Sequence, residues 1–223
     1  FEGNDWNQLE SLSLYSENIQ NIECIKNLKQ LQYLDLSHTN VSDISALENM
    51  TKLKSLQLDW LREIKDFSVI GKLTDLEELH LENTNFKDVK LLSGLTKLNC
   101  IDLEGTNISI EDRISLLRTK KIEIEDGENI DYAIYPKGIL DYRDEIKLEK
   151  NIEGISFGTV GDEHGVNLNV RAKEGVVGAT NIIIGDGEDT YAIIPLSVVS
   201  EKSGTPKFKE KEKTVSLGYV GDL

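Results

Sequence analysis

Apolar residues recur along the first half of the chain with a period of about 22 residues. Five segments begin at matching leucines, which are Leu9, Leu31, Leu53, Leu76 and Leu98. Successive leucines are separated by 22, 22, 23 and 22 residues. Each segment carries apolar side chains at seven matching positions, and 34 of these 35 positions are apolar, with Glu111 as the exception. The pattern indicates an internal repeat, with a partial sixth unit expected at Ile122 and Ile124.

Each unit predicts a short strand followed by a helical turn. The opening Leu-x-x-Leu-x-Leu alternates with a period of two, which is typical of a strand with its leucines pointing inward. The second part has apolar residues spaced by three, as at Ile19, Ile22, Ile25 and Leu28, which indicates a 3₁₀ or α turn. One unit cannot bury its own apolar face, whereas stacked units can. The sequence therefore predicts an α/β solenoid with parallel strands on a concave face and helical turns on the convex side.

The second half of the chain predicts an all-β module. The leucine period stops after Glu125, and Asp126–Asn129 reads as a turn. β-rich runs at 155–157, 166–170, 182–184 and 191–199 are separated by Gly, Asp and Glu clusters, which favours an antiparallel sandwich. We expect one domain at 1–126 and another at 127–223. Within the second, 202–213 is interpreted as a polar loop or linker, and the strand expected at 214–220 either completes the sandwich or begins another module.

The repeat resembles that of a known bacterial family. The segment from Leu34 to Leu47, LDLSHTNVSDISAL, is similar to the 22-residue leucine-rich repeats of internalins, and the likeness extends over about residues 9–125. Part of the second half, from Thr159 to Ile194, resembles bacterial Ig-like domains of group 2, without their usual tryptophan. The resemblance implies a leucine-rich-repeat solenoid followed by an Ig-like sandwich.

Two neighbouring polar positions recur in the turn after each strand, and the first of them departs from the internalin pattern. Thr stands where internalins usually carry an Asn that bonds the neighbouring coils, and we expect its hydroxyl to form part of that ladder. These residues are Thr39, Thr84 and Thr106. The next position carries Asn18, Asn40, Asn85 and Asn107, which we interpret as residues that tolerate left-handed backbone geometry.

The net charge narrows the range of partners. With 25 basic and 40 acidic side chains the formal charge is −15, so the chain would be repelled by nucleic acids and by anionic lipids. No apolar stretch approaches the ~20 residues of a membrane span, so no direct membrane insertion is expected. A basic or neutral partner is favoured.

The residues that usually carry catalysis or bind metal are scattered. His38, His80 and His164 lie in different parts of the chain, and the two cysteines, Cys24 and Cys100, have no neighbours at the spacing of a nucleophile pair or a metal site. We therefore expect no enzyme activity, no cofactor and no metal site. Both cysteines are interpreted as small apolar fillers, although Cys100 could instead be an exposed thiol on the concave side. For 185–189, GDGED, a tight hairpin turn is favoured over a calcium loop.

The concave face is strongly acidic. Of the eighteen outward strand and turn positions expected in six units, eight are carboxylates and one is basic. One column of this face is expected to stack four acids, which are Asp59, Glu82, Glu104 and Glu125. Trp60 either adds an aromatic anchor or folds inward with Leu61. The candidate partner-binding residues are Tyr15, Tyr33, Asp35, Asp59, Trp60, Glu78, His80, Glu82, Asp102, Glu104, Glu123 and Glu125.

These observations favour a recognition module. The resemblance implies a secreted or cell-surface bacterial protein, monomeric, whose concave face binds a host or surface protein and whose Ig-like domain is a rigid spacer. The alternatives are an intracellular scaffold that regulates an enzyme through its repeats, or glycan binding through the Ig-like domain. An acidic face that serves only solubility is a further alternative to a basic partner.

Overall fold

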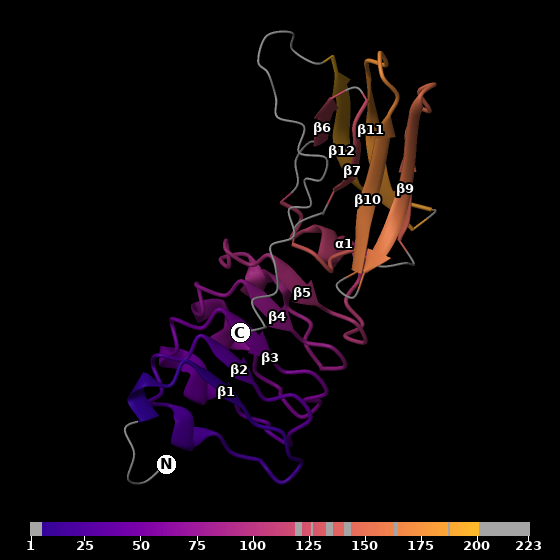
Figure 1. Ribbon diagram of the computed structural model, residues 1–223. Helices are drawn as coiled ribbons and strands as arrows, with labels where there is room; N and C mark the ends of the chain where they lie inside the picture. The colour runs from indigo at the N-terminus through magenta and orange to yellow at the C-terminus, as the bar shows by residue number, and fades with distance from the viewer. Residues whose placement is uncertain are drawn as a thin grey trace.

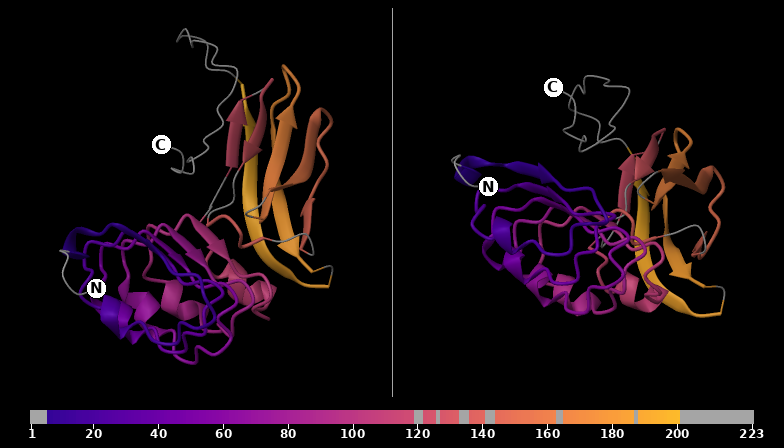
Figure 2. Two further views of the ribbon diagram at one scale, coloured as in Figure 1. Left: turned by 60° about the horizontal axis from the view of Figure 1, so that its bottom comes forward. Right: turned by 90° about the horizontal axis from the view of Figure 1, so that it is seen from below.

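The computed structural model describes residues 6–118, 122–125, 127–132, 136–140, 144–162, 165–186 and 188–200. A stack of coils forms the N-terminal half, and long antiparallel strands stand at its C-terminal end (Figure 1). The views in Figure 2 show the strands beside the last coil and away from the first.

The coils contribute one strand each to a five-stranded parallel sheet. The strands run in chain order as β1 (Ser11–Ser13), β2 (Tyr33–Asp35), β3 (Ser55–Gln57), β4 (Glu78–His80) and β5 (Cys100–Asp102). Corresponding residues are in register, so Leu34 pairs with Leu56 and Leu56 with Leu79. The N-terminal half is therefore a leucine-rich-repeat solenoid, as the period predicts.

Short helical turns return the chain between strands. They are η1 (Trp6–Gln8), η2 (Glu23–Ile25), η3 (Ser45–Asn49), η4 (Ser68–Lys72), η5 (Val89–Leu92) and α1 (Ile110–Ile114). Asp43 and Asp66 each accept the backbone N–H two residues ahead at 2.8 Å, so they fix the starts of η3 and η4. These backbone hydrogen bonds lower the pKa of both carboxyls. Ser109 caps α1 by accepting the N–H of Asp112 at 3.1 Å.

The interior follows the apolar period. All twenty-one apolar positions of the second, third and fourth coils are buried, and Leu56 in the middle of the stack is fully enclosed. In the first coil Leu9, Leu12, Leu14 and Ile19 are only partly buried, because no described coil lies on the outer side of β1. The central coils therefore hold the best-packed part of the solenoid.

The turn after each strand corrects the predicted roles of Thr and Asn. The Thr84 hydroxyl donates to Leu81 O at 2.8 Å, within its own turn, and Thr39 and Thr106 do the same in theirs. The bond between coils comes instead from Asn40, whose Nδ2 donates to Glu17 O at 2.6 Å, and from Asn85, which donates to Arg62 O. A short hydroxyl reaches only the local carbonyl, whereas the longer amide reaches the next coil.

The left-handed position lies earlier in the turn than predicted. Matching residues in four coils have positive φ, and these are His38 (57°), Trp60 (67°), Asn83 (54°) and Gly105 (69°). Of the four asparagines proposed for this geometry, only Asn107 adopts it, with φ of 57°. A Cβ on Gly105 would lie 2.4 Å from Asn83 Oδ1, so a larger residue there would displace the Asn83 side chain.

The C-terminal half forms two sheets, and its β-rich runs are strands as predicted. One sheet has the order β7 (Asn129–Tyr132), β10 (Gly165–Ala172) and β9 (Ile155–Asp162). The other has the order β6 (Ile122–Glu125), β12 (Thr190–Val199), β11 (Gly178–Gly185) and β8 (Glu145–Leu148). Leu168 and Val170 of the first sheet and Ile182, Ile184 and Leu196 of the second are buried. The expected linker at 202–213 and strand at 214–220 lie outside the described residues.

The predicted sixth repeat is wrong. Strand β6 pairs with β12 in parallel, with Ile122 beside Leu196, so it belongs to the C-terminal sheets rather than to the solenoid. Its Ile-x-Ile alternation fits either sheet, which is why the repeat pattern misassigned it. A boundary at 126 would therefore separate β6 from its sheet.

Residues 136–140 extend the solenoid sheet instead. Lys137 N–H donates to Asn99 O at 2.8 Å, and Ile101 N–H donates to Lys137 O at 2.9 Å, so this segment continues the parallel ladder beside β5. Ile139 and Leu140 are fully buried. The last apolar layer of the solenoid is thus covered by chain that follows β7.

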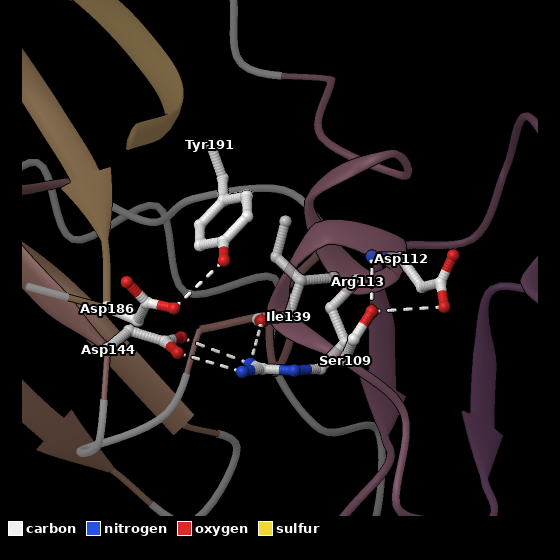
Figure 3. Close-up of polar contacts among 7 residues, drawn as sticks. All are labelled: Ser109, Asp112, Arg113, Ile139, Asp144, Asp186 and Tyr191. Atoms are coloured by element: carbon white, nitrogen blue, oxygen red, sulfur yellow. Dashed lines mark hydrogen bonds and ion pairs between the residues drawn. The ribbon is translucent and has the colours of Figure 1, made fainter. Parts of the chain in front are cut away.

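A buried ion pair joins the last coil to Asp144, directly before β8 (Glu145–Leu148), and the same arginine also bonds the covering segment 136–140 (Figure 3). Arg113 of α1 donates to both carboxylate oxygens of Asp144, at 2.8 and 3.1 Å, and its Nη1 also donates to Ile139 O at 2.5 Å. The Arg113 and Asp144 side chains are 9% and 3% exposed. The bidentate pair fixes the start of β8 against α1, and the bond to Ile139 O fixes the covering segment.

Candidate binding face

Three ring side chains form a row along the edge of the concave face. The rings of Tyr15 and His38 lie 5.5 Å apart, and those of His38 and Trp60 are stacked at 5.7 Å with an angle of 18°. The guanidinium of Arg62 lies 4.9 Å from the centre of the Trp60 ring. Tyr15 and Trp60 are 73% and 41% exposed. This aromatic row (Tyr15, His38, Trp60) is accessible and held in place by mutual ring contacts.

Trp60 points outward although its neighbour does not. Leu61 is buried and takes the place of the turn threonine, since it aligns with Thr39. The extra residue of the third coil follows, because Ile64 aligns with Val41 one residue late. Trp60 itself has a φ of 67°, which is strained for a bulky side chain. The third coil thus carries an indole at the position where the later coils have Asn83 and Gly105.

The carboxylates of the concave face are hydrogen-bonded mainly to backbone. Asp35 accepts Ser37 N–H at 2.8 Å, Asp102 accepts Glu104 N–H at 2.9 Å, and Asp59 accepts Glu82 N–H of the next coil at 2.8 Å. Among the described residues, no Lys, Arg or His nitrogen lies within ion-pair distance of these three carboxylates. The face thus carries negative charge that the described part of the chain does not neutralise.

Several acids on the outer surface of the solenoid have basic partners. Lys72 pairs with Glu48, Lys97 with Asp75 at 2.7 Å, and Lys54 with Glu77 at 3.6 Å, each pair linking neighbouring coils. The pair with Lys72 lowers the pKa of Glu48. All six side chains are well exposed, so each pair adds little stability. The contrast shows that lysines are distributed along the outer surface and not along the strands.

Asp59 is the most perturbed acid of the face. Burial is the main cause that raises its pKa, to about 6, and Asp102 and Glu82 raise it further. The hydrogen bond from Glu82 N–H and the nearby His80 act in the opposite direction. The charged form of this carboxyl is therefore disfavoured by its position.

The structure brings most of the predicted site residues together on one surface. Tyr33, Asp35, Asp59, Glu78, His80, Glu82 and Asp102 are half-buried and lie on strands β2 to β5 or the turns that follow them, and Glu104 is exposed. Glu123 and Glu125 lie on β6, in the other sheet, and their side chains are outside the described part. The predicted column of four acids is thus reduced to three, Asp59, Glu82 and Glu104, which we call the acid column.

The prediction for Cys24 needs correction, the prediction of a buried Cys100 is confirmed, and two residues at the aromatic row were not predicted. Cys24 is exposed, so it is not a buried filler, whereas Cys100 is buried because residues 136–140 pass beside it. Both are free thiols. His38 belongs to the aromatic row and Arg62 contacts it, but neither was predicted, because the two turn positions that they occupy show no apolar or charge period.

The acidic turn near residue 186 is a hairpin, as favoured from its composition. Asp186 accepts the N–H groups of Glu188 and Asp189 at 3.0 Å and the Tyr191 hydroxyl at 2.9 Å (Figure 3). The Asp186 carboxylate raises the Tyr191 pKa to about 12. A Cβ on Gly185 would lie 2.1 Å from Asp189 O, so the turn requires glycine. No group of metal-ligating side chains occurs among the described residues.

Comparison with known proteins agrees with the repeat architecture. Residues 29–72 match the family described as Leucine Rich repeats (2 copies). Among solved structures, an internalin (InlF) from Listeria monocytogenes is 35% identical over 44% of this chain and 29% of its own, with a TM-score of 0.41. Internalin C2 from the same organism is 27% identical over 51% of this chain and 50% of its own, with a TM-score of 0.42. The search of curated proteins gives no match.

The chain spans half or less of the length of these two internalins. Within the described residues, no helix has the length and apolar character needed to cross a bilayer.

Proposed function

We propose that this chain is a protein-recognition module whose concave face binds a partner with a basic patch. The observation that carries the proposal is the placement of charge. Three outer acids, Glu48, Asp75 and Glu77, are paired with lysines of neighbouring coils. On the concave face Asp35, Asp59 and Asp102 have backbone partners but no base among the described residues. A basic surface placed over the face would supply the missing counter-charges.

The aromatic row supports the same face as the contact surface. Tyr15 and Trp60 expose large amphipathic rings beside the acids, and such rings are the side chains that most often dominate the energy of protein interfaces. Ring contacts hold the row in place before a partner arrives, so little side-chain entropy is lost on binding.

We further propose that the C-terminal sheets are an Ig-like spacer and that the protein acts as a monomer outside the bacterial cell. The support for a secreted or surface location is the likeness of the repeat sequence to internalins. The support for a spacer is the junction, where the buried Arg113–Asp144 pair ties the last coil to the residue directly before β8 of the C-terminal sheets. No catalytic role, cofactor or metal is included in the proposal.

A capture experiment with charge-matched variants tests the proposed face. The wild type is compared with an acid-column variant (Asp59→Asn, Glu82→Gln, Glu104→Gln) and with a control that removes three outer charges (Glu23→Gln, Glu48→Gln, Asp75→Asn). We expect host-cell surface extracts to yield a protein that the wild type and the control retain and the acid-column variant does not. Equal retention by both variants would contradict the proposal, since net charge alone would then explain capture.

A further inference from the structure

We propose that the middle strand of the concave face carries a lysine subsite, where Ser55 Oγ and the Glu78 carboxylate accept hydrogen bonds from the ammonium group of a partner's lysine. The inference rests on the proposed function, and it names one contact of that face together with the chemical group that the contact takes.

The Ser55 hydroxyl is buried without a hydrogen-bond partner. Ser55 lies on β3 and is 9% exposed, and its Oγ bonds no other group among the described residues. Strand alternation directs it to the concave side, because the next residue, Leu56, is fully enclosed in the interior. Burial of a hydroxyl without a partner is unfavourable, so the folded chain gains no stability from this group.

Two other serines of the same face are bonded within the chain. Ser37 is 7% exposed, and its Oγ accepts Asp59 N–H at 3.2 Å. On β1, Ser13 Oγ donates to Asp35 Oδ2 at 3.2 Å. Ser55 differs from both, so its hydroxyl is left for a group that comes from outside the described chain.

The residues on the two neighbouring strands flank this hydroxyl. Tyr33 of β2 and Glu78 of β4 pair directly with Ser55, about 4.8 Å away on either side. Both side chains are half-buried and longer than serine, so the hydroxyl lies nearer to the sheet than their ends do. Among the described residues, no basic nitrogen lies within ion-pair distance of Glu78. Its side chain is therefore able to change rotamer and admit a slender group.

The chemistry of these groups favours an ammonium ion. The Glu78 carboxylate supplies the charge that selects a cation, and Ser55 Oγ is a second acceptor on the adjacent strand. A lysine ammonium has three N–H donors at the end of a slender chain, so it can bond both acceptors. The planar guanidinium of arginine is wider and is better matched to the two oxygens of one carboxylate. The Tyr33 ring would pack against the aliphatic part of the lysine.

Lysine and Nε-trimethyl-lysine probes test the subsite, because trimethylation keeps the positive charge and removes every N–H donor. Octalysine and its trimethylated counterpart are titrated into the isotope-labelled chain at pH 7.5, and local dissociation constants are read from the backbone amide resonances at positions 55 and 78. The wild type should prefer octalysine about tenfold, and Ser55→Ala should reduce this preference to about twofold. Ser11→Ala is the matched control, because Ser11 pairs with Tyr33 in the same row but is exposed, and it should keep the wild-type preference.

A second variant and a stability measurement distinguish the possible failures. Glu78→Gln should weaken the binding of both peptides at these positions, and unchanged binding would overturn the inference. Ser55→Ala should leave the free energy of unfolding unchanged or raise it, whereas a loss would show that the hydroxyl is bonded within the chain and would overturn the inference as well. Octalysine binding that leaves every resonance of the concave face unchanged would contradict the proposed function together with this inference. Binding on that face with equal preference in the wild type and Ser55→Ala would contradict this inference alone.

Discussion

The junction and the concave face each contain a carboxylate that is at least partly buried, but the surroundings of the two carboxylates differ. At the junction Asp144 is 3% exposed and receives two hydrogen bonds from the guanidinium of Arg113. On the concave face Asp59 receives one backbone N–H and stands near Glu82 and Asp102. The first arrangement serves stability, whereas the second costs stability and leaves charge for a partner to meet. The comparison therefore separates a structural acid from the acids that we propose to bind a partner.

The largest effect is expected at the junction. Asp144→Asn would leave the buried Arg113 without its counter-charge, and we expect it to lower the free energy of unfolding by about 3–5 kcal/mol in urea denaturation. The double change Arg113→Met with Asp144→Leu should recover most of this loss, because it removes both buried charges. A loss below about 1 kcal/mol for Asp144→Asn would mean that the pair does not hold the junction.

Substitution of Leu56, on the interior side of β3, should lower the free energy of unfolding almost as much. Leu56 is fully buried beside Leu34 and Leu79, and Leu56→Ala would remove its side chain and leave a cavity. We expect a loss of about 2–5 kcal/mol in urea denaturation, with unfolding that includes the neighbouring coils. If the loss stayed under about 1 kcal/mol, the register of the repeat would be wrong.

Substitution of Asp59, on the concave side of the same coil, should raise the stability of the chain at neutral pH instead of lowering it. Because the pKa of Asp59 is raised to about 6, the folded chain binds more protons than the unfolded chain between about pH 4 and pH 6. Stability from this group is therefore lost as pH rises through that range. Asp59→Asn keeps the oxygen acceptor for Glu82 N–H, and should stabilise the chain by roughly 1–2 kcal/mol at pH 7.5, after discount for solvent screening, with no gain near pH 4.

A substitution of an acid on the outer surface is the control for the predicted gain in stability. Glu48→Gln removes an acid that is exposed together with its partner, Lys72, so no measurable change in stability is expected at either pH. A loss of stability in Asp59→Asn at pH 7.5 would show that Asp59 is a structural acid, and the distinction between the two kinds of acid would fail.

The sequence predicts those parts of the molecule that repeat. Leu34, Leu56 and Leu79 occupy one column because packing between identical coils imposes a fixed period, and the strand register follows directly. The outward strand residues, and hence the acidic face, follow from the same alternation. The acids at Asp59, Glu82 and Glu104 could therefore be placed without a structure.

Parts that occur once are not encoded by a period. Ile122 and Ile124 continue the apolar alternation yet belong to the other sheet, because a strand of this pattern fits either one. Lys137 joins the solenoid through backbone hydrogen bonds that any residue could make. The Arg113–Asp144 pair joins residues 31 apart without a motif. The bond between coils was assigned to Thr84 instead of Asn85, because the distance that each side chain spans depends on the backbone of the turn.

The most direct test of the account is the association rate of the captured partner with the wild type, the acid-column variant and the outer-charge control, measured at low and at high salt. The account predicts that the wild type and the control associate fastest at low salt. Between about 0.01 and 0.15 M salt their association rates should fall roughly tenfold or more, because salt screens the attraction between the charges. The acid-column variant should associate slowly with little salt dependence, although its fold is unchanged. Equal rates and equal salt dependence for all three proteins would contradict the claim that the unpaired acids of the concave face recruit the partner.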